Sequence, residues 1–409
     1  MLSVDEALGL VVQNAVAKSA REVALTEAQG LILAADIASD VDSPPHDKSM
    51  VDGYAVRTAD FSSNQARLTV VEEITAGSLP TKSIVAGTCS RIMTGAELPN
   101  GADAVVMVER SRLDGNLMEL HDDRLRAGQN IMRRGTSMRT GETVLRRGIE
   151  LGPAEIGLLA EVGRTKIQVV PPPNVAILAT GNELVSADKQ PARGQIRNSN
   201  GPLLVAAAHR AGGTSIDLGI ARDDAAALRQ AIGTGLNSDI LVLSGGVSAG
   251  VLDLVPSVLA ELGVQEVFHK IRMKPGKPLW FGVHSPFPLP HSPLQSTLVF
   301  GLPGNPVSSL VCFELFVKPA IGRLSGRKFE PPHPTRPAVL SNEFQHRGDR
   351  PTYHPSILTE EHGGKFSVAS TPWRGSADLR GFAGANALIV FPAGERRYQA
   401  GESIDVIVL

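Results

Sequence analysis

Three consecutive prolines at residues 171–173 constrain the fold of this chain more than any other sequence feature. Proline fixes φ and has no backbone N–H, so a run of three cannot continue a helix or an inner strand. A second proline-rich stretch, residues 331–337, has the same effect nearer the C-terminus. We therefore expect the 409-residue chain to divide at these two places.

The segment between the two proline stretches alternates short apolar runs with helical patterns. The apolar runs predict buried strands at residues 175–179, 215–218, 240–243 and 297–300. The helical patterns cover residues 202–211, 224–236, 252–262 and 307–316. Strands that alternate with helices indicate a parallel sheet with helices on both faces. This segment therefore predicts an α/β domain.

The rest of the chain has other patterns. Ser3 and Glu6 form a capping box before an N-terminal helix. Residues 43–57 are expected to form a proline-led loop that ends in a tight turn at Asp52 and Gly53. Short alternating runs between turns predict β structure from residue 68 to 145 and again after residue 337.

The predicted fold class is a multidomain α/β plus β protein. A central parallel-sheet α/β domain is joined by a mostly β insertion domain, a helical N-terminal segment and a C-terminal β-barrel. The expected boundaries are residues 1–44 with 138–172 for an elongated helical and linker domain, 45–137 for the β-rich domain, 173–327 for the α/β domain and 328–409 for the barrel.

Composition excludes several classes of function. The formal net charge is −2, which argues against a general nucleic-acid binder. Cys89 and Cys312 are the only cysteines, which excludes a disulfide framework and a cysteine-based zinc site. The sequence has no signal-peptide pattern and no apolar stretch long enough for a membrane span, so we expect a cytoplasmic protein. The histidines have no ligand spacing. Ser244, Ser248 and Ser308 have no obvious His-Asp partner arrangement, which argues against a hydrolase. The first strand end of the sheet carries no GxGxxG motif, which argues against a dinucleotide oxidoreductase.

Three strand ends of the expected sheet carry loops suited to anions. Ligands of such sheets bind beyond the carboxyl ends of the strands. The loops are Thr180-Gly181-Asn182-Glu183, Ser244-Gly245-Gly246-Val247-Ser248 and Gly301-Leu302-Pro303-Gly304-Asn305-Pro306. Each loop alone could be a structural turn, but three on one sheet favour phosphate or another oxyanion.

Charged residues near the same edge could support anion binding. Lys274 and Lys277 lie in a loop stiffened by prolines, although a solvated basic turn is the alternative. Nearby carboxylates could hold Mg²⁺ beside phosphate. These are Glu183, Asp223, Asp224 and Asp253, of which Asp223 and Asp224 could instead act as helix N-terminal charges.

A second polar cluster precedes the β-rich segment. It contains Asp47, Lys48, Ser49 and Asp52, and its alternative is a capped turn. Arg133 and Arg134 could contact an anion or form a solvated edge.

Seven segments resemble, in order, the motifs of the molybdopterin molybdenumtransferase family, which includes the C-terminal domain of gephyrin. They are SMVDGYAVR, RIMTGAELPNGADAVVMVE, ILATGNELV, GQIRNSN, LSGGVSAG, MKPGKP and LPGNPVSSLVCFE. The resemblance implies insertion of molybdate into adenylylated molybdopterin, with release of AMP and molybdenum cofactor. It also implies Mg²⁺ and a homodimer whose active site lies between the molybdopterin-binding α/β domain and the partner subunit's β region. A molybdopterin adenylyltransferase is a further partner that it suggests.

Matching motif positions imply roles for single residues. The catalytic set would be Asp52, Thr94, Lys274, Lys277 and Asp253, with Asp52 and Thr94 facing the molybdate or dithiolene end. Glu183 and Asp223 would hold Mg²⁺. The pterin and nucleotide would lie against Gly181, Ser244, Gly245, Gly246, Ser248, Pro303, Gly304 and Asn305, with Ser376 supplied by the last domain.

The sequence also departs from the family pattern. Thr136 and Ser137 replace an acidic pair, Asn182 and Asn198 replace aspartates, Arg197 a tyrosine, Val251 a glutamate and Pro355 an arginine. An alternative is therefore a catalytically weakened paralogue that binds molybdopterin, its nucleotide or molybdate as a carrier or scaffold. Adenylyl transfer to molybdopterin is a third interpretation, which the additional domains disfavour.

Overall fold

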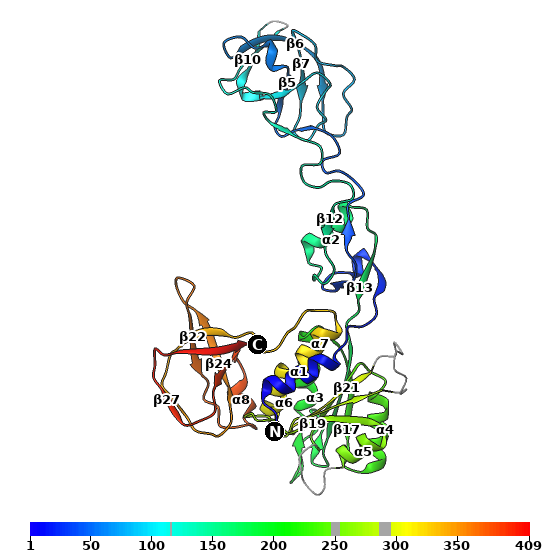
Figure 1. Cartoon of the computed structure of the whole chain (residues 1–409), viewed down its shortest axis with the longest axis vertical. Coiled ribbons are helices and arrows are strands. Elements are labelled where there is room, and N and C mark those ends of the chain that lie inside the picture. Colours follow the sequence, from blue (N-terminus) through cyan, green and yellow to red (C-terminus); the bar gives the residue numbers. More distant parts are fainter. Residues whose placement is uncertain (115–116, 247–253, 286–295) are drawn as a thin grey trace.

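The computed structural model describes residues 1–114, 117–246, 254–285 and 296–409. The molecule is elongated, with a β-rich part at one end, a narrow middle part, and an α/β part beside a β-barrel at the other end (Figure 1). Proline stretches do lie where one part gives way to the next, since strand β13 (Lys166–Val170) ends before residues 171–173 and strand β14 (Asn174–Thr180) starts after them.

A six-stranded sheet forms the centre of the α/β part. Its strand order is β17-β14-β18-β21-β20-β19. The four parallel strands are β14, β17 (Thr214–Ala221), β18 (Ile240–Ser244) and β21 (Thr297–Leu302). The apolar runs in the sequence predict these four strands, but they do not predict β19 (Val264–His269) and β20 (Trp280–His284), which pair antiparallel at one edge. The apolar runs of these two strands are short and flank the basic residues 270–278. The basic residues and prolines there favour a loop, so the sequence predicts one.

Helices cover both faces of this sheet, as predicted. Alternate residues of β14 point to opposite faces, so Val175 and Ile177 enter one apolar cluster while Ala176 and Leu178 enter another. Helices α4 (Ala225–Gly235) and α5 (Val255–Glu261) pack on one face. The other face holds α3 (Asn200–Arg210), α6 (Pro306–Cys312), a π-helical turn η4 (Phe313–Val317) and α7 (Lys318–Leu324).

The N-terminal helix α1 (Val4–Asn14) begins with the predicted capping box. The Ser3 side chain accepts from the Glu6 N–H, and the Glu6 carboxylate accepts from the Ser3 N–H. Helix α1 packs against α7, and its buried Leu8 and Val11 belong to the same apolar cluster as β14. The helix therefore joins the core of the α/β part.

The middle part is small. Strands β1 (Arg21–Ala24), β13 and β2 (Ile32–Leu33) form a three-stranded antiparallel sheet. A 3₁₀ turn η1 (Leu25–Glu27) and helix α2 (Pro153–Glu161) pack beside them. Strands β3 (Ile37–Ala38) and β12 (Thr143–Leu145) pair on the way to the β-rich part.

The β-rich part holds a second six-stranded sheet, in the order β8-β5-β7-β6-β10-β9. Its strands are β5 (Gly53–Val56), β6 (Gln65–Ile74), β7 (Thr88–Ile92), β8 (Ala104–Met107), β9 (Ser111–Asp114) and β10 (Leu117–His121). A separate pair joins β4 (Lys48–Ser49) to β11 (Ile131–Met132), and 3₁₀ turns η2 (Thr58–Asp60) and η3 (Val108–Arg110) connect strands.

The prediction of a single loop over residues 43–57 is wrong, because Gly53 starts the buried strand β5. A Cβ atom on Gly53 would lie 1.9 Å from the Val106 carbonyl oxygen. Only glycine lets β5 approach β8 this closely, so Gly53 is required by strand packing and not by a turn.

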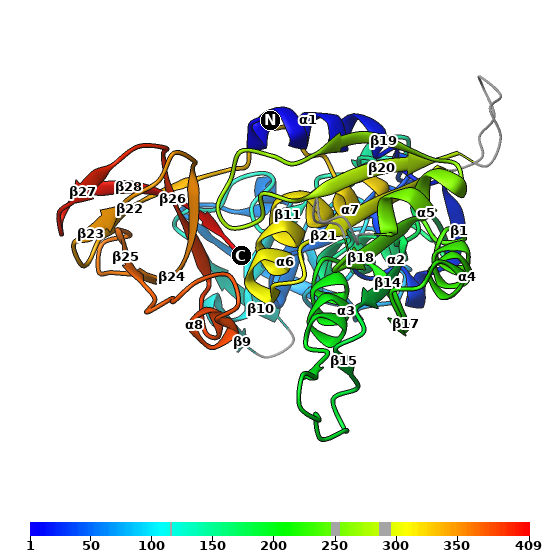
Figure 2. The same cartoon turned by 90° about the horizontal axis from the view of Figure 1, so that it is seen from below.

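A closed five-stranded barrel forms the C-terminal part and confirms the predicted barrel. Its strands are β22 (Arg336–Leu340), β25 (Phe366–Ser370), β24 (Thr352–Glu360), β26 (Ala387–Phe391) and β28 (Ser403–Val408), in that order around the barrel. Strands β23 (Phe344–His346) and β27 (Arg396–Tyr398) pair beside it, and the short helix α8 (Leu379–Phe382) precedes β26. The barrel lies against the α/β part on the side of α6 and α8 (Figure 2).

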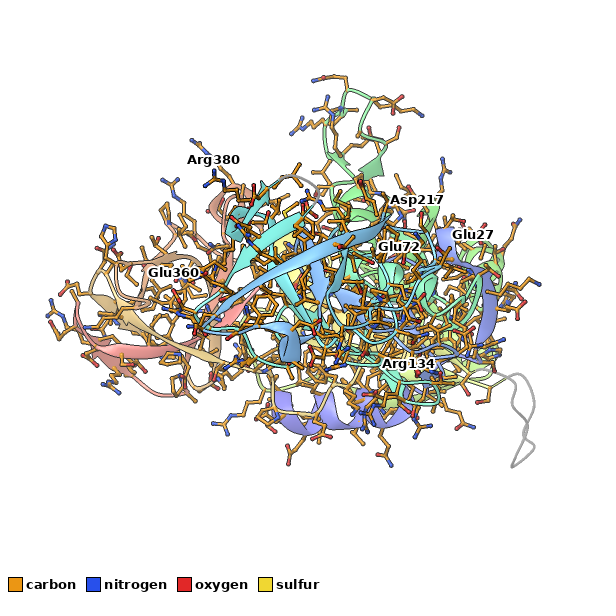
Figure 3. The ribbon with its side chains drawn as sticks, turned by 90° about the horizontal axis from the view of Figure 1, so that it is seen from above. Glu27, Glu72, Arg134, Asp217, Glu360 and Arg380 are labelled. Atoms are coloured by element: carbon orange, nitrogen blue, oxygen red, sulfur yellow. The ribbon has the colours of Figure 1, made fainter. Side chains whose placement is uncertain are left out.

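One small loop extends from the α/β part. Strands β15 (Leu184–Val185) and β16 (Ile196–Arg197) pair in parallel at its base, and the chain between them projects from the molecule (Figures 2 and 3). Charged side chains such as Arg380 of α8 point outward into solvent (Figure 3). Across the described part of the chain, every helix is too short or too polar to cross a membrane.

Candidate functional site

A cavity of about 720 Å³ lies at the carboxyl ends of β14, β18 and β21. Its volume is in the range of small-molecule sites. The structure brings together here residues of all three predicted anion loops. They are Thr180, Gly181 and Glu183 at the end of β14, Ser244, Gly245 and Gly246 at the end of β18, and Pro303, Gly304 and Asn305 after β21.

Glycine is required at the tip of β18. Gly245 has φ +98°, and a Cβ atom there would lie 2.6 Å from the carbonyl oxygen of Thr180. Gly246 has φ +64°, and its Cβ would lie 2.7 Å from a methyl group of Val255. A side chain at either position would collide with these neighbours, so both positions require glycine. Because glycine has no side chain, the backbone of the loop faces the cavity.

Asn200, at the start of α3, is the residue that sequence reasoning missed. Its Nδ2 donates to Ser244 Oγ and to the Gly304 carbonyl oxygen, both at 2.7 Å, and so joins two of the three loops. Its Oδ1 is buried and has no hydrogen-bond partner among the described residues. A buried acceptor beside a cavity is an attractive position for a ligand N–H group. The position closes the GQIRNSN segment, but nothing in its spacing indicated a binding role.

The C-terminal part of the chain closes one side of the cavity. Asn305 Nδ2 donates to Ser376 Oγ at 2.9 Å, and the Val307 N–H donates to the Ser376 carbonyl oxygen at 3.0 Å. Ala377 lines the cavity directly. The segment before α8 is thereby held against the N-terminal end of α6.

Two carboxylates, Glu183 and Asp223, line the same cavity. Glu183 folds back over Gly181, where a Cβ atom would meet its Oε2 at 2.7 Å. Two carboxylates fit a Mg²⁺ ion, which takes few protein ligands and completes its shell with water and phosphate oxygens. No group of three His, Cys, Asp or Glu residues suited to a metal occurs in the described ranges.

Asp224 is a helix cap. Its side chain accepts from the N–H groups of Ala226 and Ala227 at the start of α4. This geometry confirms the helix-charge alternative for Asp224.

The two asparagines that replace aspartates make local backbone contacts. Asn182 Oδ1 accepts from the Asp223 N–H at 3.2 Å, and Asn198 Oδ1 accepts from the Gly201 N–H at 3.0 Å in the first turn of α3. An aspartate oxygen would accept the same bonds. These replacements therefore remove charge near the cavity while they keep the local fold.

The two lysines lie in the connection between β19 and β20, and both are exposed. Lys277 directly precedes Pro278, which lines the cavity. Lys274 lies beside the barrel, because its N–H donates to the Pro351 carbonyl oxygen at 2.9 Å and its carbonyl accepts from Tyr353 at 2.8 Å. Neither lysine side chain is among the residues that line the cavity.

Asp52 and Thr94 form a pair in the β-rich part. Asp52 Oδ1 accepts from the Thr94 N–H at 2.7 Å and from Thr94 Oγ1 at 2.8 Å. These bonds hold the pKa of the Asp52 carboxyl below its usual value. The β-rich part and the α/β part lie at opposite ends of the molecule, so one chain does not bring this pair to the cavity (Figure 1).

The nearby basic residues of the β-rich part are paired. Arg133 donates to Asp47 at 2.6 Å, and Arg134 donates to Asp42 at 2.6 Å. Thr136 and Ser137 are exposed in the turn that follows. Pro355 is buried within barrel strand β24.

Ser248, Val251 and Asp253 lie outside the described residues, so their predicted roles stay predictions.

Three family models match successive parts of the chain. They are described as "MoeA N-terminal region (domain I and II)" for residues 2–163, "Probable molybdopterin binding domain" for residues 176–323 and "MoeA C-terminal region (domain IV)" for residues 337–409. The matched ranges include all three loops of the cavity.

Relatives and solved structures resemble the chain over all or nearly all of its length. A "Molybdopterin molybdenumtransferase" of Bacillus subtilis is 34% identical over 100% of this chain and 94% of its own length. The protein of the same name from Nostoc is 36% identical over 95% of this chain and 88% of its own length. A crystal structure of the molybdopterin biosynthesis protein MoeA from Pyrococcus horikoshii covers 100% of both chains with a TM-score of 0.82 and 28% identity.

Proposed function

Because this chain belongs to the molybdopterin molybdenumtransferase family, we propose that it is the enzyme that inserts molybdenum, supplied as molybdate, into molybdopterin. The proposed substrate is adenylylated molybdopterin, and the proposed products are molybdenum cofactor and AMP. The reaction belongs to molybdenum cofactor biosynthesis, and we propose that it takes place in the cytoplasm.

The cavity at the sheet tips carries this proposal. Two glycine-containing loops and the N-terminal end of α6 converge there, and the glycines keep side chains away from the space. Molybdate and a pyrophosphate-linked nucleotide are both anions, and oriented N–H groups and cations must offset their mutual repulsion. The cavity supplies the loops, and Lys277 adjoins its wall through Pro278.

Glu183 and Asp223 would hold Mg²⁺ in the proposed enzyme. The ion would neutralise phosphate charge on the bound nucleotide. Asn200 would position the substrate through its buried Oδ1, and Asn305 and Ser376 would hold the cavity closed on the barrel side. Gly181, Ser244, Gly245, Gly246, Pro303 and Gly304 would form the wall against which pterin and nucleotide lie.

We further propose that the complete site needs two subunits. The β-rich part, which contains Asp52 and Thr94, lies far from the cavity of its own chain, so in the proposed enzyme a second chain would supply these residues (Figure 1). An antiparallel homodimer would place the β-rich part of one chain over the cavity of the other. A molybdopterin adenylyltransferase that delivers the adenylylated substrate would be the further partner.

The alternative proposal is a binder without turnover. Thr136, Ser137, Asn182 and Asn198 all stand where the family motifs carry acids, and Val251 does as well. Loss of these charges lowers the repulsion that an anion meets near the cavity and favours retention of the ligand. The retained Asp52, Glu183 and Asp223 favour turnover.

A molybdenum insertion assay decides between the two proposals. Purified protein is incubated with adenylylated molybdopterin, molybdate and Mg²⁺, and released AMP and molybdenum cofactor are measured. The enzyme should form both products, and Glu183→Gln should reduce the rate at least about tenfold if one Mg²⁺ ligand is lost. Arg229→Gln, an exposed charge change outside the cavity lining, is the control and should leave the rate unchanged. Tight substrate binding with no AMP release would reject the enzyme and establish the binder.

A further inference from the structure

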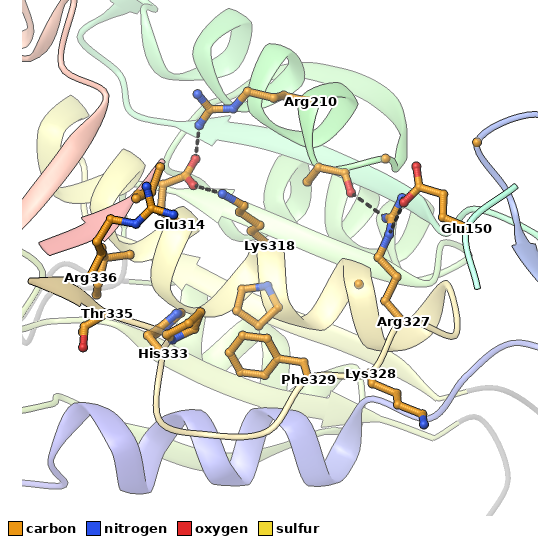
Figure 4. Close-up of a pocket in the computed structure, with 18 residues that line it drawn as sticks. Glu150, Arg210, Glu314, Lys318, Arg327, Lys328, Phe329, His333, Thr335 and Arg336 are labelled. Carbon is orange, nitrogen blue, oxygen red and sulfur yellow. Dashed lines mark hydrogen bonds and ion pairs between the residues drawn. The ribbon is translucent and has the colours of Figure 1, made fainter. Parts of the chain in front are cut away.

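A second cavity, of about 750 Å³, lies at the C-terminal end of α3, whereas the first lies at its N-terminal end (Figure 4). Three parts of the chain meet around it: the middle part through Glu150, the helices α3 and α7, and the barrel through Arg336 and Ile407. The segment of residues 325–336, which leads from α7 to the barrel, forms one wall. None of the residues assigned to the proposed reaction lines this cavity.

The cavity is strongly basic although the chain as a whole is not. Its described lining contains five side chains with fixed positive charge and two carboxylates. They are Arg210, Lys318, Arg327, Lys328 and Arg336 against Glu150 and Glu314. The difference is three positive charges, in a protein whose formal net charge is −2. Such a concentration attracts anions.

A buried carboxylate fixes two of these cations over the cavity. The Glu314 side chain is only 2% exposed and lies in the π-helical turn η4. Arg210 and Lys318 both pair with it, and the Lys318 Nζ to Glu314 Oε2 distance is 2.9 Å (Figure 4). The three groups carry one net positive charge, and the guanidinium and ammonium groups keep further N–H donors for a ligand.

Arg327 is also held in place. It donates to Glu150 at 3.1 Å and to the Ala211 carbonyl oxygen at 3.4 Å (Figure 4). Lys328 and Arg336 have no ion pair with any described carboxylate, although Arg336 lies over the Phe366 ring at 4.3 Å. Structural ion pairs therefore account for only part of the charge in this cavity. The remaining charges repel one another unless an anion offsets them.

An apolar wall lies beside the cations. Phe329 contacts His333 edge-on with ring centroids 5.5 Å apart, and Pro319 and Ile407 complete this side. His333 bonds the Leu315 carbonyl oxygen at 2.7 Å, and burial keeps the pKa of this imidazole below its usual value. The wall is therefore uncharged and contains an aromatic ring.

We propose that this cavity binds an organic phosphate that carries at least two negative charges and a ring. The fixed guanidinium groups would take the phosphate oxygens, because planar guanidinium donors match phosphate geometry. The ring would lie against Phe329. A ligand so placed ties the middle part, the α/β part and the barrel together, and the proposal stands whether or not the molybdenum insertion is correct.

ADP is the probe, and hydrogen exchange measured by mass spectrometry locates it. Binding should protect residues 325–336 in the wild-type protein and equally in Glu183→Gln, which alters the other cavity. Inorganic pyrophosphate should bind more weakly than ADP, because it lacks the ring. Protection confined to residues 244–246 and 303–306, or no binding of ADP at all, would overturn the proposal. Equal affinities for pyrophosphate and ADP would overturn the assignment of a ring.

A matched pair of double variants tests the charges. Arg327→Gln/Arg336→Gln removes one ion-paired arginine and one arginine stacked on an aromatic ring. Arg397→Gln/Arg396→Gln removes an ion-paired arginine and a ring-stacked arginine on the barrel, where Arg397 pairs with Glu343 and Arg396 lies over Tyr398 and also pairs with Glu402. The first should weaken ADP binding at least about tenfold and the second less than about twofold. Equal affinities in the two double variants would overturn the proposal. If the first double variant unfolds, the single variant Arg327→Gln is used instead, and it should also weaken ADP binding.

Discussion

Asn305 Nδ2 lies 2.9 Å from Ser376 Oγ, which joins the loop before α6 to the segment before α8. The two residues are 71 positions apart in the chain. One belongs to the predicted anion loops and the other to the C-terminal part, so the cavity is completed only when the barrel packs on the α/β part. The barrel thus takes part in the site through a single short segment.

Ser376→Ala should weaken the site without unfolding it. The change removes the hydroxyl that accepts from Asn305, but the backbone bond from Val307 N–H to the Ser376 carbonyl oxygen stays. A neutral hydrogen bond contributes about 0.5–1.5 kcal/mol, so we expect a loss of about twofold to tenfold in kcat/KM for molybdenum insertion. Ser367→Ala, in barrel strand β25, is the control. A full loss of activity with an unchanged melting temperature would instead assign Ser376 a direct part in the reaction.

Asn200→Ala should destabilise the α/β part by about 1–3 kcal/mol, because it leaves Ser244 and the Gly304 carbonyl without a buried donor. Urea unfolding in a Trp373→Phe background measures this, since Trp280 is then the only tryptophan and is buried in the same sheet. The control is Asn237→Ala, whose amide contacts helix carbonyls at an exposed position. Equal effects of the two changes would contradict the assigned role of Asn200.

Much of the fold could be predicted from sequence patterns because the patterns are local. The apolar runs of β14, β17, β18 and β21 and the alternation with helices predict the parallel half of the sheet. The capping box predicts the start of α1. Strands β19 and β20 could not be predicted in this way, because an antiparallel edge depends on pairing between distant residues and their own runs are short.

The candidate site was predictable in its loops but not in its contacts. Strand-end glycines in the sequence identified residues 244–246 and 301–306. Gly245 and Gly246 do have positive φ and approach their neighbours closely. Asn200 left no such signal, because its importance comes from a side chain that bridges two loops far away in the chain. The separation of Asp52 from the cavity of its own chain also left no signal in the residue pattern, and only the family resemblance implied a site shared with the β region of a partner subunit.

A mixture of two inactive variants should recover activity if the site is shared between subunits. Asp52→Ala removes the proposed contribution of the β-rich part, and Glu183→Ala removes that of the cavity. In a heterodimer one site carries both defects and the other carries none. Random exchange of subunits at equal amounts should therefore restore about a quarter of the wild-type rate. Two inactive variants that stay inactive after verified exchange would show that each chain forms its own site.

The retained carboxylate of Asp52 should stay ionised in acid. The Thr94 N–H and hydroxyl both stabilise the charged form, so the folded pKa lies below the unfolded one, and the stabilisation is lost only as pH falls through the folded pKa. Thr94→Ala removes the hydroxyl but leaves the backbone N–H, which is the larger cause. Its carboxyl pKa, followed by ¹³C NMR, should rise only part of the way to the usual value. A pKa unchanged by Thr94→Ala would mean that the hydroxyl does not stabilise the carboxylate.

The barrel should lose stability in mild acid because of His354. Burial, with a smaller contribution from the charge of Lys274, lowers the pKa of His354 from 6.5 to about 4. The unfolded chain binds the proton more readily, so the free energy of unfolding should fall as pH decreases from about 6.5 to about 4, by about 3 kcal/mol in all.

Urea unfolding in a Trp280→Phe background follows Trp373, whose ring meets that of His354 edge-on at 5.2 Å. His354→Gln should flatten this pH dependence, whereas His362→Gln, an exposed change in the same barrel, should leave it as in the wild type. If His354→Gln keeps the full pH dependence, the acid sensitivity of the barrel comes from another group.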